Sequence, residues 1–245
     1  MIGSSLLAVN VAVGQHIQTK LFGLTINLDD VLATVAAGLI LVVLGLVLRA
    51  RVTSGVPGKL QLVYETIVGA ATNQVETTMG PKGLFIVPLA VTLFMFILLC
   101  NWFELIPSAL QGHLEVITSP TGDINLPLAL ALTVIVLVHV TWIRLHGLKS
   151  YLGHYFKPYK GLFLINVIEE IAKIFTLALR LFGNIFAGGI LITLIAAFPP
   201  QWILPTPLLQ FVWKLFDGFF VAPVQAFIFA LLTIIYMQSA VSGGH

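Results

Sequence analysis

The sequence predicts an all-α integral membrane protein with five transmembrane helices and one amphipathic helix at the membrane interface. Of its 245 residues, 58% are hydrophobic and only 9% are Asp, Glu, Lys or Arg, whereas a soluble domain carries about 25% charged residues. The mean hydropathy is +1.03. So few charges can cover a protein surface only where lipid replaces water over most of it. The apolar residues are gathered in long stretches, and the basic residues that lie between these stretches fall in alternate connections.

Five stretches are long and apolar enough to cross a membrane, which takes about 20 residues in a helix. They cover residues 31–48, 83–106, 126–143, 162–198 and 208–237. The last two are longer than an upright helix through a hydrocarbon core of about 30 Å, and a Pro-rich turn separates them. They predict two long, tilted helices that form a hairpin, and Pro223 can kink the second by removing a backbone donor.

The remaining segments complete a single membrane domain of residues 1–245. Residues 1–30 are expected to form an external N-terminal segment. In residues 58–78, apolar side chains recur at helical spacing from Leu60 to Val75, with Lys59 and Glu65 at other positions. This pattern is typical of an amphipathic helix that lies in the cytoplasmic membrane interface.

The basic residues predict the orientation of the spans. One set of connections holds Arg49, Arg51, Lys59, Lys82, Arg144, Lys149, Lys157 and Lys160. The opposite set, residues 107–125 and 199–207, holds no Lys or Arg. Because cytoplasmic loops retain basic residues, we expect a multi-pass plasma-membrane protein with its N-terminus outside and its C-terminus in the cytoplasm.

Several classes of function are excluded by composition. The net charge of +2 is small and scattered, so the chain lacks the basic stripe that nucleic-acid binding needs. Cys100 is the single cysteine and cannot form an internal disulfide or a CxxC site. His139 and His146 lie roughly on one face of a helix, but no other span supplies a second histidine pair for haem. We therefore expect no cofactor and no metal.

Charged residues inside the fourth span indicate a functional site, because a charge within the bilayer is costly. Glu169, Glu170 and Lys173 lie near its cytoplasmic end, where Glu169 and Lys173 have the spacing of a local ion pair. Arg180 lies deeper and has no acid one helical turn away. If its partner acid is not in this helix, that acid must come from another helix or another subunit. An internal ion pair, or an arginine that snorkels to the interface, is the structural alternative.

Arg180 lies on a face of small and polar residues. Ala172, Thr176, Arg180, Asn184 and Gly188 recur every four residues and follow one slowly drifting face of the helix. Small residues on such a face allow another helix to approach closely.

Acids that belong to the outer half of the membrane are few. Glu104 ends the second span, with Asn101 one turn before it, and Asp217 lies in the fifth span, two turns before Gln225. These side chains are candidates for a polar path. The alternatives are an interfacial acid at Glu104 and a local pair between Asp217 and Lys214, three residues before it.

The stretch Leu177–Gly189, LALRLFGNIFAGG, resembles subunit a of the bacterial F-type ATP synthase. Four further motifs follow the order of that family: NWFELIP at Asn101–Pro107, PTGDINLPLALAL at Pro120–Leu132, VIEEIAK at Val167–Lys173 and PVQAFIFALLTIIYM at Pro223–Met237. The resemblance covers most of the chain from about residue 80 onward, and the first 30 residues are not diagnostic.

The resemblance implies a stationary proton-translocating subunit beside a rotating ring of c-subunits. Two offset half-channels would meet the ring on either side of Arg180, which matches the essential arginine of the family. The implied partners are the c-ring, b-type peripheral stalk subunits, the other F1Fo subunits, lipids and protons. The chain itself would not catalyse the chemistry of ATP.

The resemblance also assigns individual positions. Asn184, Gln225 and Glu104 match polar or acidic positions of the proton path, and Glu169 and Glu170 match acids near the cytoplasmic exit. The small residues of the ring-contact face are Thr176, Gly183, Ala187 and Gly188.

Two positions depart from the family pattern. Many relatives carry an ionisable residue where this chain has Gly189, and often a histidine where it has Gly218. Our hypothesis is that Asp217 and Glu104, with His139, replace this missing relay. The alternative function is a self-contained channel or secondary transporter that uses Arg180 as an anion or gating site.

Overall fold

Among the residues that the structure describes, five helices are long and apolar enough to cross a membrane, which confirms the predicted all-α membrane fold. The computed structural model describes residues 18–21, 24–105, 109–110, 114–115, 119–154, 161, 163–197 and 205–242. The helices are α1 (Leu28–Arg51), α2 (Lys59–Met79), η1 (Pro81–Ile86), α3 (Val87–Trp102), η2 (Phe103–Leu105), η3 (Pro120–Gly122), α4 (Asn125–His154), α5 (Phe163–Ala196), α6 (Pro205–Phe216), η6 (Asp217–Val221) and α7 (Ala222–Ser242). The segments η1, α3 and η2 form one continuous span, and α6, η6 and α7 form another.

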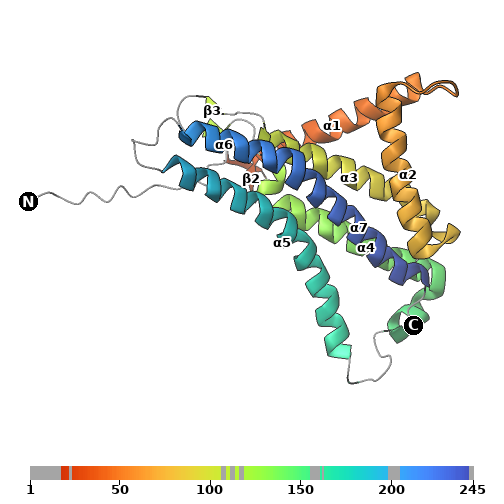
Figure 1. Cartoon of the computed structure of the whole chain (residues 1–245). Coiled ribbons are helices and arrows are strands. Elements are labelled where there is room, and N and C mark those ends of the chain that lie inside the picture. Colours follow the sequence, from red (N-terminus) through yellow and green to blue (C-terminus); the bar gives the residue numbers. More distant parts are fainter. Residues whose placement is uncertain are drawn as a thin grey trace, which may run out of the picture.

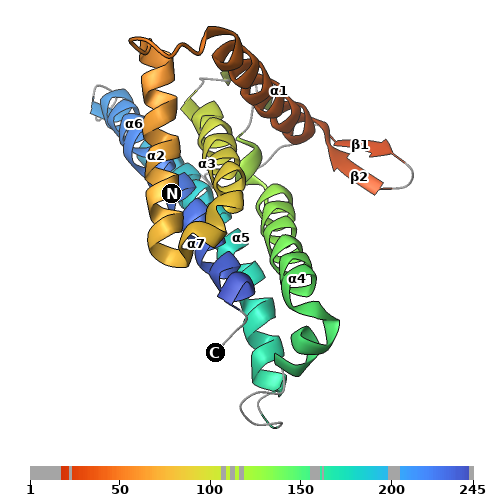
Figure 2. The same cartoon turned by 90° about the vertical axis from the view of Figure 1, so that its right-hand side faces the viewer.

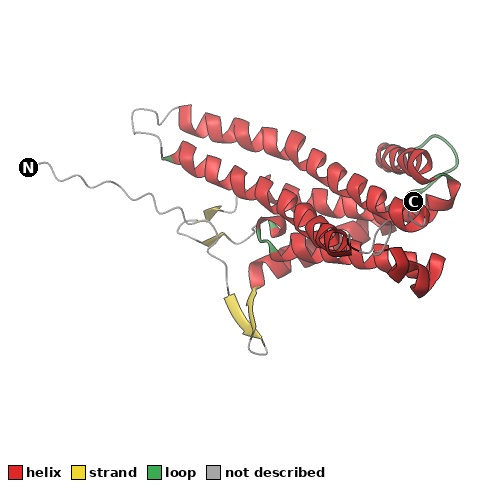
Figure 3. Cartoon of the chain, turned by 90° about the horizontal axis from the view of Figure 1, so that it is seen from below, coloured by secondary structure: helices red, strands yellow, loops and turns green. Residues whose placement is uncertain are grey.

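Two short antiparallel hairpins lie outside the membrane helices. The first pairs β1 (Gln18–Leu21) with β2 (Leu24–Asn27), and the second pairs β3 (Ala109–Leu110) with β4 (Leu114–Glu115). Both lie at the end of the bundle where α5 ends and α6 begins (Figures 1 and 3). We call this the hairpin end, and we call the opposite end, which α2 crosses, the α2 end.

The first span shows how the sequence encodes a lipid-facing helix. Asp29 and Asp30 lie in the first turn of α1, and Arg49 and Arg51 lie in its last turn. The acidic residues lie at the positive end of the helix dipole and the basic residues at its negative end, so both pairs of charges stabilise the helix. Between them the apolar side chains are largely exposed, as at Leu39, which is 60% exposed. Because lipid solvates such side chains, exposure here has no hydrophobic cost.

The second helix crosses the bundle rather than spanning it. In Figure 1, α2 is steeply inclined to α3 and α7, and Figures 1 and 2 show that it lies beside both. Gly80 ends it with a φ of +69°, in the left-handed region that glycine adopts without strain. Pro81 then begins η1, so the chain turns sharply into the second span.

The core lies between α3, α4, α5 and α7. Ile97, Val134, Leu177 and Leu181 are almost completely buried there, together with Ala226. Small residues of α7 such as this alanine allow the helices to approach closely. The packing fixes how each helix is rotated about its axis, and so decides which polar side chains meet.

The last two spans form the predicted tilted hairpin. With 34 residues, α5 is about 51 Å long, and Figure 1 shows that it bends midway and that α6 lies along its second half. The partner span is interrupted by a single π turn, η6, just before Pro223. In α4, Gly147 interrupts the helix with a φ of +80°, so its last residues turn away from the main axis.

Candidate functional site

Arg180 lies half-buried on α5, the first span of this hairpin. Among the residues that the structure describes, no carboxylate oxygen lies within 4.0 Å of its guanidinium. The described part of the bundle therefore does not provide the internal ion pair that would make Arg180 purely structural.

The drifting face around Arg180 changes from open to covered along the helix. Ala172 and Thr176 are exposed, Arg180 and Asn184 are half-buried, and Gly188 is buried. The buried residues of α5 are Leu177, Ala178, Leu181, Ile185 and Gly188, so the drifting face turns into the buried side of the helix at Gly188. The open part of the face is therefore available to a partner helix near the α2 end, and the covered part meets α6 near the hairpin end.

Two of the small residues expected on this face have open surroundings. Gly183 is half-buried, and a Cβ atom built on it would have no neighbour within 4 Å. Ala187 is exposed. By contrast, a Cβ atom on Gly188 would lie 3.7 Å from Trp213 Nε1 and 3.9 Å from Glu104 Oε1. Gly188 therefore belongs to the covered part of the face.

The structure brings Glu104 and Asp217 together at the hairpin end. Asp217 is 8% exposed at the start of η6, and its side chain shares a hydrogen bond with the side chain of Glu104. Lys214, one turn earlier, donates from Nζ to the backbone oxygen of Glu104 over 3.3 Å. We call Glu104, Asp217 and Lys214 the hairpin-end cluster. It reaches α5 at Gly188, eight residues from Arg180, or about 12 Å along the helix axis.

A π turn positions this cluster. The backbone N–H of Ala222 donates to Asp217 O, one residue further back than in an α-helix, which leaves the oxygen of Gly218 without its usual partner. Trp102 Nε1 donates to that oxygen over 2.9 Å. The indole thus fixes η6 against the end of the second span, beside Glu104.

Sequence reasoning missed this π turn, although Gly218 and Pro223 were the available signals. A Cβ atom on Gly218 would lie 2.4 Å from Leu105 Cδ2 and 2.6 Å from its Cγ. Any larger side chain at this position collides with Leu105. The departure from the family pattern at Gly218 therefore has a packing reason in this chain.

Asn101 belongs to a buried row of hydrogen-bonded polar side chains. The hydrogen bond that the structure defines for Asn101 does not involve Glu104. Thr121 Oγ1 donates to Asn101 Oδ1 over 2.8 Å, and Ser119 Oγ lies 2.8 Å from Thr121 Oγ1. Ser119 also donates to the backbone oxygen of Cys100 over 3.1 Å. These bonds tie η3 to the end of α3. Neither Ser119 nor Thr121 was singled out from the sequence, because both lie in a connecting segment.

A second cluster of two acids and a lysine lies on the other side of Arg180. Lys173 Nζ is 2.8 Å from Glu170 Oε1 and 3.3 Å from Glu169 Oε1, so the local pair expected between Glu169 and Lys173 is present. The ammonium also lies 5.9 Å from the ring centroid of Tyr236 on α7. Glu169 has a 63% exposed side chain, whereas that of Glu170 is 26% exposed. We call Glu169, Glu170 and Lys173 the α2-end cluster.

Gln225 and His139 lie apart from the two clusters. Gln225 is half-buried on α7, two turns beyond Asp217. His139 is half-buried on α4, about 21 Å from the start of that helix. Its ring lies 5.6 Å from that of Tyr151, which the break at Gly147 folds back onto the helix. His139 therefore lies toward the α2 end.

Asp123 forms a separate hydrogen-bonded site outside the spans, at the hairpin end. Burial raises the pKa of its carboxyl group, but hydrogen bonds from Asn125 and Asn27 and one shared with Asp30 hold that pKa below its ordinary value. Asn27 Nδ2 donates to Asp123 Oδ2 over 2.6 Å. This bond joins the end of β2 to the segment that leads into α4. Among the described residues, no group of three His, Cys, Asp or Glu side chains has the geometry of a metal site.

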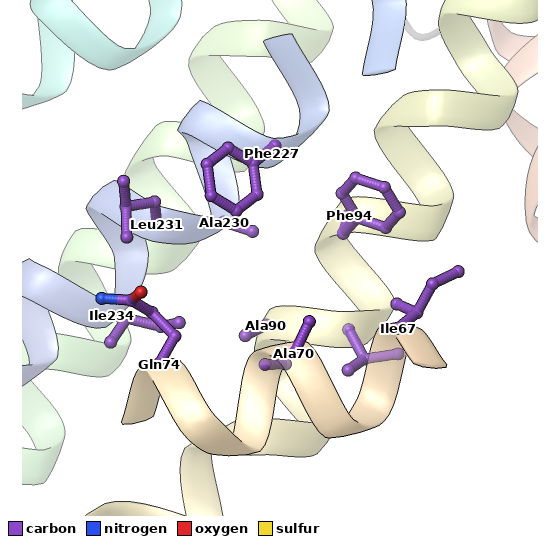
Figure 4. Close-up of a pocket in the computed structure, with 11 residues that line it drawn as sticks. Ile67, Ala70, Gln74, Ala90, Phe94, Phe227, Ala230, Leu231 and Ile234 are labelled. Carbon is purple, nitrogen blue, oxygen red and sulfur yellow. The ribbon is translucent and has the colours of Figure 1, made fainter. Parts of the chain in front are cut away.

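An apolar groove lies between α2, α3 and α7 (Figure 4). It encloses about 510 Å³, including its open side. Gln74 is the polar member of its lining, and the others are Ile67, Ala70, Ala71, Ala90, Val91, Phe94, Phe227, Ala230, Leu231 and Ile234. Since all of these side chains are uncharged, the groove offers no group that carries a proton, and the charged clusters are the better candidate site.

The fold and the site together define a multi-pass α-helical membrane protein with titratable side chains inside its bundle, which is typical of proteins that move ions or protons. The family model described as "ATP synthase A chain" matches residues 31–238. This chain therefore belongs to the ATP synthase A chain family. The family and the five apolar helices make it a multi-pass protein of the plasma membrane.

Individual relatives support the assignment over nearly the whole chain. A protein of Acidothermus cellulolyticus named "ATP synthase subunit a" is 52% identical over 241 residues, which cover 98% of this chain and 86% of the relative. A protein of the same name from Mycobacterium tuberculosis is 48% identical over 246 residues, with 96% of each chain covered. One from Bacillus velezensis is 37% identical over 237 residues, which cover 92% of this chain and 96% of the relative.

Proposed function

We propose that this chain is the proton-translocating stator subunit a of the ATP synthase Fo sector, in which Arg180 couples proton flow to the rotation of a c-ring. The observation that carries the proposal is the environment of Arg180. It is a half-buried cation on a face of small residues, and among the described residues no carboxylate lies within 4.0 Å of it. A carboxylate of the ring is the partner that this face accommodates.

Arg180 acts by favouring the ionised form of each ring carboxylate that passes it. At about 4 Å and an effective dielectric constant near 20, the attraction is about 4 kcal/mol before desolvation is subtracted. That is enough to promote release of the proton without permanent capture of the carboxylate. Arginine suits this role because it stays protonated in proteins, whereas a buried lysine can lose its proton.

The two clusters provide a half-channel on each side of Arg180. On the outer side, protons pass through Glu104 and Asp217 and reach the ring near Asn184, with Gln225 along the same path. On the cytoplasmic side, they leave through Glu169 and Glu170. Because the half-channels are offset, a proton crosses only by riding the ring, and each charge gains about 2.3 kcal/mol per 100 mV.

The geometry refines the roles that the resemblance suggests. Glu104 and Asp217 supply the outer relay between themselves, since their side chains already share a hydrogen bond. His139 packs on Tyr151 toward the α2 end and is left out of this relay. Thr176, Gly183 and Ala187 face the ring, whereas Gly188 lies under Trp213 and Glu104 and borders the outer path.

The proposed orientation places the hairpin end outside the cell and α2 in the cytoplasmic interface. The N-terminus then lies outside and the C-terminus in the cytoplasm. In the F1Fo complex, the exposed small face of α5 contacts the c-ring, b-type peripheral stalk subunits contact the surface away from the ring, and lipid covers the remaining exposed apolar side chains.

The test is ATP-driven proton pumping in inverted membrane vesicles that carry Arg180→Lys in a verified, assembled complex. We expect pumping to be lost, because lysine does not provide a permanent cation. Normal pumping would show that Arg180 is structural. A self-contained channel or secondary transporter predicts instead that the purified chain conducts protons in liposomes without the ring, where we expect no conduction.

A further inference from the structure

One indole N–H near the hairpin end has no hydrogen-bond partner in the described part of the chain. Trp213 is half-buried on α6, and its Nε1 atom is buried without an acceptor among the described residues. By contrast, Trp102 Nε1 donates to the backbone oxygen of Gly218 over 2.9 Å. A buried N–H group without an acceptor is costly, and an ordered water molecule satisfies many such groups in proteins. Trp213 therefore marks a place where a water molecule would bind.

Trp213 shares this place with Glu104, next to a glycine of α5. A Cβ atom built on Gly188 would lie 3.7 Å from Trp213 Nε1 and 3.9 Å from Glu104 Oε1, so a donor and an acceptor flank one point. Because residue 188 is a glycine, its own side chain does not fill that point. A water molecule is not bonded to the Cα atom, so it lies farther from the helix than a Cβ atom and closer to both polar groups. Such a water can bridge two groups that do not bond to each other directly.

We propose that Trp213 and Glu104 hold a water molecule over Gly188, and that this water passes protons from the hairpin-end cluster toward the ring. The inference rests on the proposed function and adds a step to the same path. Gly188 lies four residues beyond Asn184 on the drifting face and eight beyond Arg180, or about 6 Å and 12 Å along the helix axis. A water at Gly188 therefore extends the outer path toward the residues that face the ring.

An indole suits this role because its N–H group only donates and does not compete for the transferred proton. The N–H of Trp213 binds the water oxygen, and the protonated carboxyl group of Glu104 donates to the same oxygen. As that proton moves to the water, one of the water's own protons leaves toward the ring carboxylate. The water is regenerated, and the Glu104 carboxylate takes the next proton from the outer side. Trp213 is thus a positioning residue, since it holds the water but exchanges no proton.

Two substitutions remove the water without removing an acid. Gly188→Ala places a Cβ atom at the flanked point with ordinary van der Waals distances, so alanine fits there and displaces the water. Trp213→Phe keeps an aromatic ring beside that of Phe216, which lies 5.7 Å away between centroids, but removes the N–H group.

The first readout is ATP-driven proton pumping in inverted vesicles of the assembled complex. We expect each variant to lower pumping about tenfold, less than the loss of about a hundredfold expected when a proton-carrying acid is removed. The double variant should lose no more than either single variant, because both substitutions act on one water. Trp142→Phe is the matched control, since it removes an indole N–H on α4, where Trp142 lies against the rings of His146 and Tyr151.

The second readout separates this role from a packing role. The indole N–H contributes an ultraviolet resonance Raman band whose position depends on its hydrogen bonding. Subtracting the spectrum of the Trp213→Phe complex isolates the contribution of Trp213. We expect a hydrogen-bonded N–H in wild type and a free N–H in Gly188→Ala, a change that packing alone does not predict. If Trp213→Phe does not assemble, Trp213→Tyr supplies the reference spectrum.

Several results would overturn the inference. A free Trp213 N–H in wild type would mean that no water is held, and a bonded N–H that persists in Gly188→Ala would place its acceptor elsewhere. Pumping at the wild-type rate by Gly188→Ala would mean that the water carries no protons. If Gly188→Ala does not assemble, alanine does not fit where we place the water, and if neither Trp213 variant assembles, Trp213 is structural.

Arg180→Lys, measured in parallel, separates the two proposals. Normal pumping by Arg180→Lys would refute the proposed function, whereas the Raman band of Trp213 does not depend on pumping. Lost pumping by Arg180→Lys together with a free Trp213 N–H in wild type would refute only the water site.

Discussion

Glu104 and Asp217 share a side-chain hydrogen bond, although they lie at the end of the second span and in the first third of the fifth. The contact depends on the π turn η6 and on the bond from Trp102 Nε1 to Gly218 O. Together these features place a buried carboxyl group beside the covered face of α5, at Gly188. The pair connects the hairpin end of the bundle to the helix that carries Arg180.

The first prediction concerns this carboxyl pair. Replacing Asp217 with Asn keeps the size of the side chain but removes a group that can pass a proton. We expect ATP-driven proton pumping in vesicles to fall by about a hundredfold, the lower end of the usual contribution of general acid–base groups. Glu104→Gln should have an effect in the same direction. The matched control is Glu76→Gln, which changes an exposed acid on α2. If Asp217→Asn pumps protons at the wild-type rate, Asp217 is not part of the proton path.

The second prediction concerns the packing at Gly218. A Cβ atom there would lie 2.4 Å from Leu105 Cδ2, whereas one on Gly189 would have no neighbour within 4 Å. Gly218→Ala should therefore destabilise the protein by about 1–3 kcal/mol through overpacking. Gly189→Ala should be neutral or stabilising by up to about 1 kcal/mol, because alanine favours a helix more than glycine does.

Thermal unfolding of the detergent-solubilised complex measures both variants, and Leu105→Ala provides the internal check. If the collision with Leu105 is the cause, the double variant should recover part of the stability lost in Gly218→Ala, because substitutions in contact are not additive. Strict additivity would show that the loss arises elsewhere.

The third prediction concerns pH and Asp123. Its pKa is below the ordinary value because hydrogen bonds from Asn125 and Asn27 outweigh the effect of burial. A carboxyl group with a lowered folded-state pKa stabilises the fold fully above its unfolded pKa of about 3.9, and that stabilisation is lost as the pH falls through the folded value. Asp123→Asn should therefore lower the unfolding temperature at neutral pH.

The difference between wild type and Asp123→Asn should shrink as the pH falls below about 4. Thermal unfolding of the detergent-solubilised chain across that range is the measurement, with Glu76→Gln again as the control at an exposed acid. A difference that stays constant from neutral to acidic pH would mean that ionisation of Asp123 does not contribute.

Much of the architecture could be predicted because it depends on local properties of the chain. The length and apolar character of each span follow from the thickness of the bilayer, and the hairpin of α5 with the last span follows from two overlong helices and a Pro-rich turn. The drifting face of Arg180 follows from the helical repeat alone. The sequence also showed that Arg180 has no acid one helical turn away, and which group pairs with it stays a prediction.

The contacts within the candidate site could not be predicted in the same way. The sequence suggested Lys214 as a partner of Asp217, but the structure shows Lys214 bonded to the backbone of Glu104 and Asp217 sharing a hydrogen bond with the Glu104 side chain. It suggested Asn101 as a neighbour of Glu104, but the structure bonds Asn101 to Thr121. It grouped His139 with the outer acids, but the break at Gly147 brings Tyr151 against its ring toward the α2 end.

There is a physical reason why the sequence predicted the spans but not the contacts within the site. The sequence by itself determined which segments enter the membrane, where the charges lie along them, and which family the motifs resemble. In lipid, a side chain that faces the bilayer is as apolar as one that faces the core, so hydrophobic pattern does not reveal how a helix is rotated about its axis. That rotation is set by close packing and by single polar bonds such as Trp102 to Gly218. Only the tertiary structure therefore decided that Glu104, Asp217 and Lys214 meet.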